Sequence, residues 1–366
     1  MIGGDEIAMK RAAWMNTGNM GDLVSMMLSH VDPNKPLPAR LPKLIQFLIQ
    51  APKAAHDGTL RRVDRARDIV AKLGLNRFCQ EAVYCIAERW DGRGYPESLR
   101  GTFIPLTSRI LMVAMIVDLF DIIEGREGVE KALHARRSHQ LDSEIVNTFS
   151  SVATDQFWLE FQNPELRQVV IDMEPESGCY WIDHDRLDSV IEAFADAVDV
   201  KSPWTGLHST GVAMVAERLA RRLALSDDEV RKIRRAALLH DLGKMSVPNS
   251  ILDKPGKLEP SEWERMRLHP YYTERILEHV EAFQDLALIA GAHHECLDGS
   301  GYPHGLKGQE IPPGARILSV ADRFHALSED RPYRSRMETA AILDTMSKAV
   351  GPQIDPDIFA ALKSML

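Results

Sequence analysis

Several features that would define other classes of protein are scarce in this chain. Only four of its 366 residues are cysteines, and they form neither a CxxC pair nor a zinc-finger spacing, so we expect reduced thiols rather than disulfides or a thiolate metal site. The most apolar stretch, residues 110–120, is too short to span a membrane. The N-terminus has no secretion signal, which favours a cytoplasmic protein.

An excess of positive charge is also missing. The formal net charge is −9, whereas surfaces that bind nucleic acid are usually basic. We therefore expect no direct binding to nucleic acid and, without a membrane span, no membrane association. An anionic substrate would need a site that is locally positive.

A repeat is the most informative feature that is present. At a constant offset of 207, residues 88–114 match residues 295–321 at 15 of 27 positions, and both copies contain the pattern DGxGYP. The second copy is preceded by the pair His293 and His294, whereas the first has Ile86 and Ala87 at the equivalent positions. The chain thus contains two versions of one fold, of which only the second kept the residues for metal binding.

Helical periodicity dominates both halves and strand signals are scarce, which predicts an all-α fold of two tandem helical-bundle domains. We place the domains at residues 1–182 and 183–366. Helices are predicted over residues 62–73, 107–123, 186–198, 208–223, 227–239, 261–268, 271–280, 283–294, 313–328 and 337–349. Residues 1–60 are rich in proline, which predicts an irregular lead-in or a segment that packs against the first domain.

Five histidines and two aspartates stand where helices should face the core of the second domain. They are His208, His240, Asp241, His269, His293, His294 and Asp322. A single such histidine is more often a hydrogen-bonded core residue, but a buried carboxylate is costly unless a cation or hydrogen-bond donors offset its desolvation. Because all seven project toward one core, we predict a metal centre. Imidazole and carboxylate without thiolate suit iron, manganese or zinc.

The number of candidate ligands exceeds the need of one ion. We therefore expect two divalent ions that share a carboxylate, with Asp241 as the natural bridge. Two such ions would activate a bridging water and stabilise charge on a transferring phosphoryl group.

The order of these motifs resembles one known family. The matching residues are His240-Asp241 with Lys244, His269-Pro270, His293-His294-Glu295 with the DGSGYP loop, Asp322, and Arg331-Pro332-Tyr333-Arg334. Over residues 185–366 they resemble the HD-GYP branch of the HD phosphohydrolases. The resemblance implies an all-helical fold and hydrolysis of cyclic di-GMP to pGpG or GMP, or of 3′3′-cyclic GMP-AMP in some members. It also implies bound metal, most often iron or manganese, with zinc, nickel or magnesium as alternatives.

The resemblance implies a role for each matching residue. One metal would be held by His208, His240, Asp241 and Asp322, and the other by Asp241, His269, His293 and His294. Lys244 would contact the scissile phosphate, while Tyr302, Arg331 and Arg334 would position the dinucleotide and its second phosphate. The predicted reaction is attack of a metal-bridging hydroxide on a phosphodiester, with the metals and Lys244 balancing negative charge as the 3′ oxygen leaves, so Asp241 and Lys244 are the predicted catalytic residues. Family members with three metals have a glutamate four residues before the first ligand histidine. This chain has Trp204 there, so we expect a binuclear site.

Two other functions stay open at this point, namely hydrolysis of a different phosphoester and a non-catalytic receptor for the dinucleotide. Glu295 either orients a ligand histidine or is a surface residue at a helix end. We expect His304 and His325 to be solvated or to have packing roles.

The first domain is expected to bind no catalytic metal, because Arg62 and Met115 stand at the positions equivalent to His269 and Asp322. We interpret it as a degenerate HD-GYP-like domain with a structural or regulatory role. Its GYP loop is expected to persist for turn geometry, since glycine readily adopts φ > 0. A homodimer and a regulatory partner that contacts this domain are both compatible with the sequence.

Overall fold

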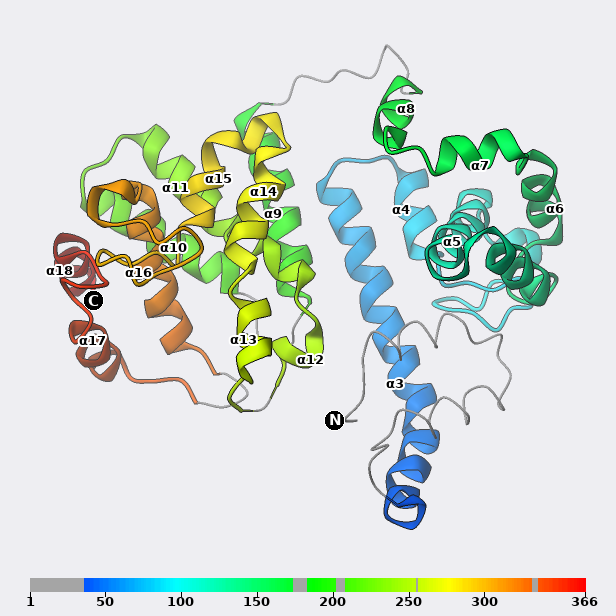
Figure 1. Ribbon diagram of the computed structural model, residues 1–366, viewed down its shortest axis with the longest axis horizontal. Coiled ribbons are helices and arrows are strands. Elements are labelled where there is room, and N and C mark those ends of the chain that lie inside the picture. The colour runs from blue at the N-terminus through cyan, green and yellow to red at the C-terminus, as the bar shows by residue number, and fades with distance from the viewer. Residues whose placement is uncertain (1–35, 174–182, 202–207, 255, 331–334) are drawn as a thin grey trace. The chain divides into compact units, whose positions relative to one another are not determined.

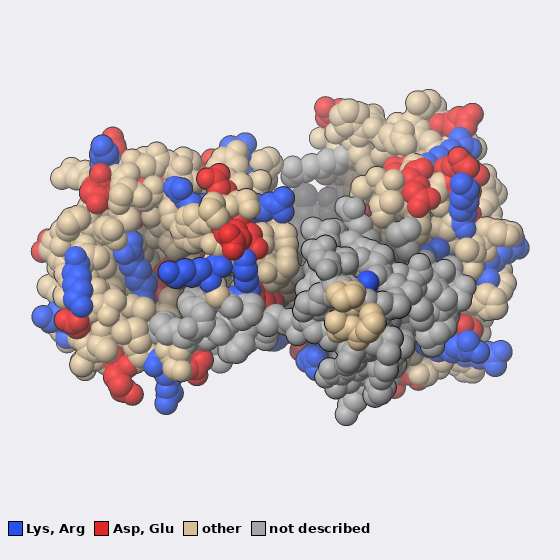
Figure 2. Space-filling model, turned by 60° about the horizontal axis from the view of Figure 1, so that its bottom comes forward, with Lys and Arg blue, Asp and Glu red and all other residues tan. Residues whose placement is uncertain are grey.

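The computed structural model describes residues 36–173, 183–201, 208–254, 256–330 and 335–366 (Figure 1). The chain divides into two compact units, Met1–Asp183 and His184–Leu366. The described residues form helices without a β-strand, which confirms the predicted all-α fold. None of the helices in these ranges is long and apolar enough to cross a membrane. Acidic and basic side chains of the described residues are interspersed on the face shown in Figure 2.

The first unit packs its core around a long helix that bends at Gly125, where φ is 66°. Ile116 and Phe120 of this helix are buried in one apolar cluster with Trp158. The helices among the described residues of this unit are α3 (Leu37–Lys72), α4 (Arg77–Tyr84), η1 (Gly101–Phe103), α5 (Leu106–Arg136), α6 (Ser143–Val152), α7 (Asp155–Phe161) and α8 (Leu166–Asp172).

The described part of the N-terminal segment is more regular than the sequence predicts. The expectation of an irregular lead-in is wrong there, because α3 begins at Leu37. Pro38 lies in the first turn, where N–H groups have no intrahelical partner. Pro42 and Pro52 each remove one hydrogen bond from a helix of 36 residues, which keeps the others.

The second unit buries the apolar faces of several helices against one another, with Leu219, Leu239, Leu286 and Leu318 in a common core. The predicted helices over residues 227–239 and 313–328 have the observed bounds, whereas the helix predicted over 283–294 ends earlier. The helices are α9 (His184–Asp199), α10 (His208–Arg222), α11 (Asp227–Leu239), η3 (Leu242–Ser246), α12 (Asn249–Leu252), α13 (Pro260–Met266), α14 (His269–Glu278), η4 (Glu281–Phe283), α15 (Gln284–Gly291), η5 (Gly308–Glu310), α16 (Pro313–Ser328), α17 (Thr339–Ser347) and α18 (Pro356–Met365).

The GYP loop has matching backbone geometry in the two units. Gly92 and Gly299 both adopt left-handed conformations, with φ of 79° and 80°, as expected for glycine. At Gly94 and Gly301 the main chain passes so close to an earlier turn that an added Cβ would lie 2.5 Å from the Cα atom of Glu88 or Glu295. The repeated glycines therefore preserve the shape of the loop, with or without metal ligands nearby.

A buried glutamate holds each of these loops. The Glu295 carboxylate accepts hydrogen bonds from the backbone N–H groups of His304, Gly305 and Leu306. Glu88 accepts equivalent bonds in the first unit, where its partners are the N–H groups of Glu97 and Leu99. Both alternatives considered for Glu295 are thus wrong, because its carboxylate binds the loop backbone and its side chain is buried.

Candidate metal centre

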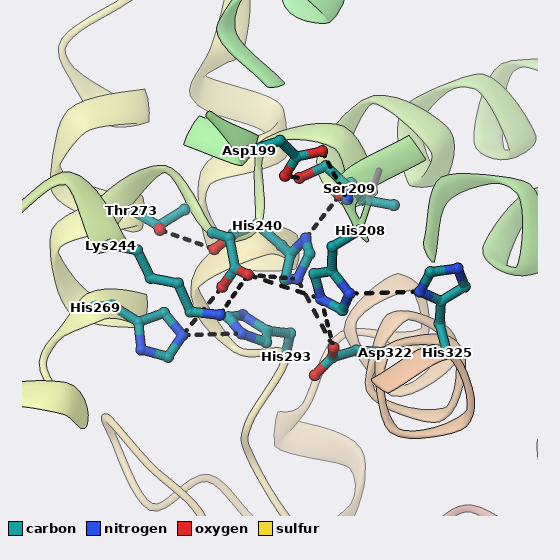
Figure 3. A network of polar contacts seen from close by, with 12 residues as sticks. Asp199, His208, Ser209, His240, Lys244, His269, Thr273, His293, Asp322 and His325 are labelled. Carbon is teal, nitrogen blue, oxygen red and sulfur yellow. Dashed lines mark hydrogen bonds and ion pairs between the residues drawn. The ribbon is translucent and has the colours of Figure 1, made fainter. Parts of the chain in front are cut away.

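Separate elements of the second unit bring their polar side chains to one place (Figure 3). His208 is the first residue of α10, His240 and Asp241 follow α11, His269 is the first residue of α14, His293 and His294 follow α15, and Asp322 lies in α16. The structure therefore gathers all seven predicted ligands. Because they come from different helices, the packing of the bundle sets the distances between them.

Two groups of side chains lie side by side at the centre. The first group consists of His208, His240 and Asp322, and the second of His269, His293 and His294. His208 Nε2 lies 3.2 Å from Asp322 Oδ1, and His269 Nε2 lies 3.3 Å from His293 Nε2. Donor atoms at about 2.1 Å from one tetrahedral ion are about 3.4 Å apart, so each group has the spacing of a shared ion.

Asp241 lies between the two groups and contacts both. Its Oδ2 is 3.4 Å from His240 Nε2 and 3.8 Å from His208 Nε2. Its Oδ1 is 3.4 Å from His269 Nε2, in the second group. One carboxylate therefore presents an oxygen to each group, as a bridging ligand does.

The backbone fixes the tautomer of three of these histidines. The Nδ1 atoms of His240, His269 and His293 lie 2.7, 2.8 and 2.6 Å from main-chain carbonyl oxygens, each three residues earlier in the chain. A carbonyl oxygen only accepts, so each Nδ1 carries the proton and each Nε2 keeps its lone pair. All three lone pairs are thus available to an ion, as is usual for ligand histidines.

Two buried polar atoms support the fit to a metal. Among the described residues, His240 Nε2 and Asp241 Oδ1 have no hydrogen-bond partner, although both are removed from solvent. Leaving a buried polar atom unpaired costs about 1–3 kcal/mol. A divalent cation would satisfy both atoms, and the donor set of imidazole and carboxylate suits such an ion.

Burial and charge hold most of these groups in the protonation state that a metal requires. Burial lowers the pKa of His269 to about 3 and that of His294 to about 4, so both rings stay neutral. Burial would raise the pKa of Asp241, but the neighbouring His240, Lys244 and other groups hold it well below the usual value. Metal ligands must be deprotonated, and these residues are so at neutral pH.

His208 behaves differently from the other histidines. Burial favours its neutral form, but hydrogen bonds to Asp322 and Glu329 outweigh this effect and raise its pKa to about 9. Without metal the ring is therefore charged between two carboxylates. Ligation at Nε2 would release a proton, as metal binding generally does.

Tight backbone contacts fix the first residue of α14 against the end of α11. An added Cβ at Gly243 would lie 2.0 Å from the carbonyl oxygen of His269, so only glycine allows this approach. Thr273 reinforces it, because its hydroxyl donates to the His240 carbonyl and accepts from the Gly243 N–H. The local sequence thereby places His269 beside the His240-Asp241 pair.

A buried carboxylate holds the start of α10. Asp199 accepts hydrogen bonds from the backbone N–H and the hydroxyl of Ser209, at 3.2 and 2.7 Å. Negative charge is favourable near a helix N-terminus, where N–H groups lack intrahelical partners. This contact anchors the turn that carries His208.

Positive charge and aromatic rings border the centre. Lys244 Nζ lies 2.5 Å from Asp241 Oδ2, inside the cluster. The ring of Tyr302 is 4.9 Å from that of His294, and the Arg267 guanidinium lies 5.0 Å from the Tyr302 ring. Trp263 is 6.3 Å from Tyr302 and 46% exposed, so an aromatic surface open to solvent lies beside the predicted substrate residue.

Some residues near the site were missed or misjudged from the sequence. Glu329 and His325 contact His208, with Nδ1 of His208 3.0 Å from Glu329 Oε2 and 3.4 Å from His325 Nδ1. His325 comes three residues after Asp322 and Glu329 comes seven residues after it, and this helix-like spacing is a signal that could have indicated them. His304, for which a solvated or packing role was expected, has Nε2 2.6 Å from Glu274 Oε2.

Three residues with predicted significance lie outside the described residues. They are Arg331 and Arg334, which were expected to bind substrate, and Trp204, which was expected to exclude a third metal. Their expected roles stay predictions.

These observations define a class of protein, namely all-α proteins with a buried histidine and aspartate centre for divalent metal ions. The chain belongs to the HD domain family, whose model matches residues 51–140 and 192–358, and within it to the HD-GYP phosphohydrolases. The matched ranges fall in both units. Membership implies dependence on divalent metal, in agreement with the clustered donor groups.

Curated relatives support this assignment. The chain is 35% identical over 363 residues to the 3′3′-cGAMP-specific phosphodiesterase 3 of Vibrio cholerae serotype O1, covering 99% of this chain and 79% of that protein. It is 40% identical over 180 residues to the cyclic di-GMP phosphodiesterase response regulator RpfG of Xanthomonas campestris pv. campestris, covering 49% of this chain and 48% of that protein. The chain therefore aligns with most of the first relative and about half of the second.

A solved structure agrees with the fold. A crystal structure of a cyclic GMP-AMP specific phosphodiesterase of V. cholerae matches 98% of this chain and 85% of that chain, with a TM-score of 0.60 and 32% sequence identity. The similarity thus extends over both units.

Proposed function

We propose that the protein is a metal-dependent phosphodiesterase that hydrolyses a purine cyclic dinucleotide. The observation that carries this proposal is the pair of donor groups joined by Asp241, with the ammonium group of Lys244 beside them. The enzymatic class is that of its relatives, which are phosphodiesterases for 3′3′-cGAMP or cyclic di-GMP.

Two divalent ions, iron or manganese, form the proposed cofactor. One would be held by His208, His240, Asp241 and Asp322, and the other by Asp241, His269, His293 and His294. Bound ions would supply Lewis acidity and lower the pKa of a water molecule that attacks phosphorus. The locked Nδ1–H bonds orient the rings, so little reorganisation is needed when an ion binds.

The chain's own residues would bind and orient the substrate. Lys244 is placed to hold a phosphate oxygen, because its ammonium group lies at the cluster and, among the described residues, forms an ion pair with the Asp241 carboxylate alone. We propose that Tyr302 positions the dinucleotide, with Trp263 as a face on which a base stacks. Arg331 and Arg334 are proposed to bind the second phosphate.

Substrate preference is proposed from the extent of each similarity. The cGAMP-specific relative aligns with nearly the whole chain, whereas the cyclic di-GMP relative aligns with about half of it. We therefore place 3′3′-cGAMP first and cyclic di-GMP second. For the first unit we propose a structural or regulatory role without metal, since in the described part of the chain every candidate metal group lies in the second unit.

The experiment that tests the function is a time course with each dinucleotide. Anaerobically purified protein loaded with iron or manganese should linearise at least one of the two substrates. Asp241→Ala should reduce both metal content and turnover to background, because it removes the donor common to both groups. Asp228→Asn, at the exposed start of α11, serves as the matched control. Full turnover in Asp241→Ala would contradict the proposal, as would dinucleotide binding without hydrolysis by the metal-loaded wild type.

A further inference from the structure

His208 differs from three other histidines of the centre in the group that contacts its Nδ1 atom. The Nδ1 groups of His240, His269 and His293 bond to backbone carbonyl oxygens. His208 Nδ1 instead lies 3.0 Å from Oε2 of Glu329, a carboxylate. A carboxylate is a stronger acceptor than a carbonyl, and it makes the opposite ring nitrogen a better metal donor.

Glu329 directly follows the last residue of α16 and has an extended backbone. Asp322, seven residues earlier in α16, contacts Nε2 of His208 at 3.2 Å, and Glu329 contacts Nδ1. The imidazole of His208 therefore lies between two carboxylates, one within α16 and one at its C-terminal end, with one carboxylate for each nitrogen.

His325 fills the space between α16 and α10 next to this pair. Its Nδ1 lies 3.4 Å from His208 Nδ1 (Figure 3). The same Nδ1 lies 3.6 Å from Glu329 Oε2. The ring fits only because residue 211 is glycine, since a Cβ at Gly211 would lie 1.8 Å from His325 Nε2. Gly211 is three residues after His208, so this space opens directly beside the ligand histidine.

We propose that Glu329 is a positioning residue that orients His208 and strengthens it as a donor, and that His325 keeps the Glu329 carboxylate in place. The inference rests on the proposed metal centre and adds an asymmetry to it. The ion held by His208, His240 and Asp322 depends on Glu329. The ion held by His269, His293 and His294 does not.

The test is a metal titration of the full chain. Metal-free protein is titrated with Mn²⁺ in competition with a chromophoric chelator, which gives a dissociation constant for each ion, and bound metal is counted by elemental analysis. Loss of a second-shell partner typically weakens metal binding by about 10–100-fold. Glu329→Ala should weaken one of two sites by this amount and leave the other unchanged. Glu329→Gln should lie between Ala and wild type, because its amide oxygen still accepts from Nδ1–H. Glu338→Gln, an exposed glutamate before α17, is the matched control and should match wild type.

A third variant keeps the inference testable if Glu329→Ala does not fold. Gly211→Ala places a methyl group where His325 lies but favours the helix, since alanine has the higher helix propensity by about 1 kcal/mol. It should weaken the same site as Glu329→Ala, by a smaller factor. If Glu329→Ala does not fold, normal Mn²⁺ binding by both Glu329→Gln and Gly211→Ala would overturn the inference.

The outcomes separate this inference from the proposed function. Wild-type protein that binds no Mn²⁺ overturns the proposed metal centre itself. Two ions in wild type with both constants unchanged in Glu329→Ala overturn only the role of Glu329. Three ions in wild type and two in Glu329→Ala would also overturn it, because His208, His325 and Glu329 would then be direct ligands of a third ion.

Discussion

A comparison of Glu295 with Glu88 can separate the contribution of a GYP loop to stability from its contribution to catalysis. Each is buried and accepts backbone hydrogen bonds from its own GYP loop, at distances of 2.7–3.1 Å. Glu295 binds the loop of the unit with the candidate ligands, whereas Glu88 binds the loop of the unit where Ile86 and Ala87 replace the histidine pair. The change Glu→Gln at each position keeps the volume but replaces one oxygen by an amide donor.

The contacts set the size of the expected effect. Three N–H groups bond to Glu295, and a glutamine can accept through only one oxygen, so at least one donor loses its partner and the others lose a charged one. Hydrogen bonds to charged groups contribute about 1.5–3 kcal/mol each, so we expect Glu295→Gln to cost about 2–3 kcal/mol. For a unit of this size that corresponds to a fall in Tm of about 5–10 °C. Glu88 accepts from the N–H groups of Glu97 and Leu99, and we expect about 1–2 kcal/mol for Glu88→Gln.

The assay combines differential scanning calorimetry with kinetics of the metal-loaded protein. Glu295→Gln should lower the Tm and raise KM, since its loop carries Tyr302, while metal content stays at the wild-type level. Glu88→Gln should lower the Tm but leave KM and metal content unchanged. The reasoning is refuted if both variants raise KM equally, or if neither changes the Tm.

Two further predictions concern acid stability and the aromatic surface. In the metal-free protein, His269 and His294 titrate at about 3 and 4 when folded but near 6.5 when unfolded, so the unfolded chain takes up protons first as the pH falls. Stability, measured as the urea midpoint, should therefore drop between pH 7 and pH 4. The contribution of His208 has the opposite sign, because it is fully present below about pH 6.5 and is lost as the pH rises from there through about 9. The two histidines with lowered pKa values outweigh it, so a midpoint at pH 5 equal to or above that at pH 7.5 would contradict this. Trp263→Ala should raise KM by about 5–100-fold with unchanged metal content, because stacking of a base contributes about 1–3 kcal/mol, while Trp263→Phe keeps part of the effect. Equal KM values for Trp263→Ala and wild type would exclude stacking on this ring.

Local patterns in the sequence were sufficient for the fold class and for the list of candidate ligands. The helices α11 and α16 have the predicted bounds because their periodicity and capping signals are local, as with the capping box of Ser226 and Glu229. Only the last part of α3 was predicted, as the helix over residues 62–73, because propensity counts the earlier prolines as breakers whereas a long helix tolerates them. The end of α15 was placed too late, because an apolar face does not mark the residue at which a helix stops.

Residue type and spacing along the chain were enough to predict that seven histidine and aspartate residues face one core and that a second copy lacks them. How these residues divide into two groups depends on how separate helices pack, because that packing sets the distances between ligands. The packed structure also shows that Glu295 holds a loop and that Glu329 contacts His208. The contact between Glu329 and His208 joins residues that are far apart along the chain. The contacts of Glu295 lie in an irregular loop, where periodicity does not indicate the direction of a side chain.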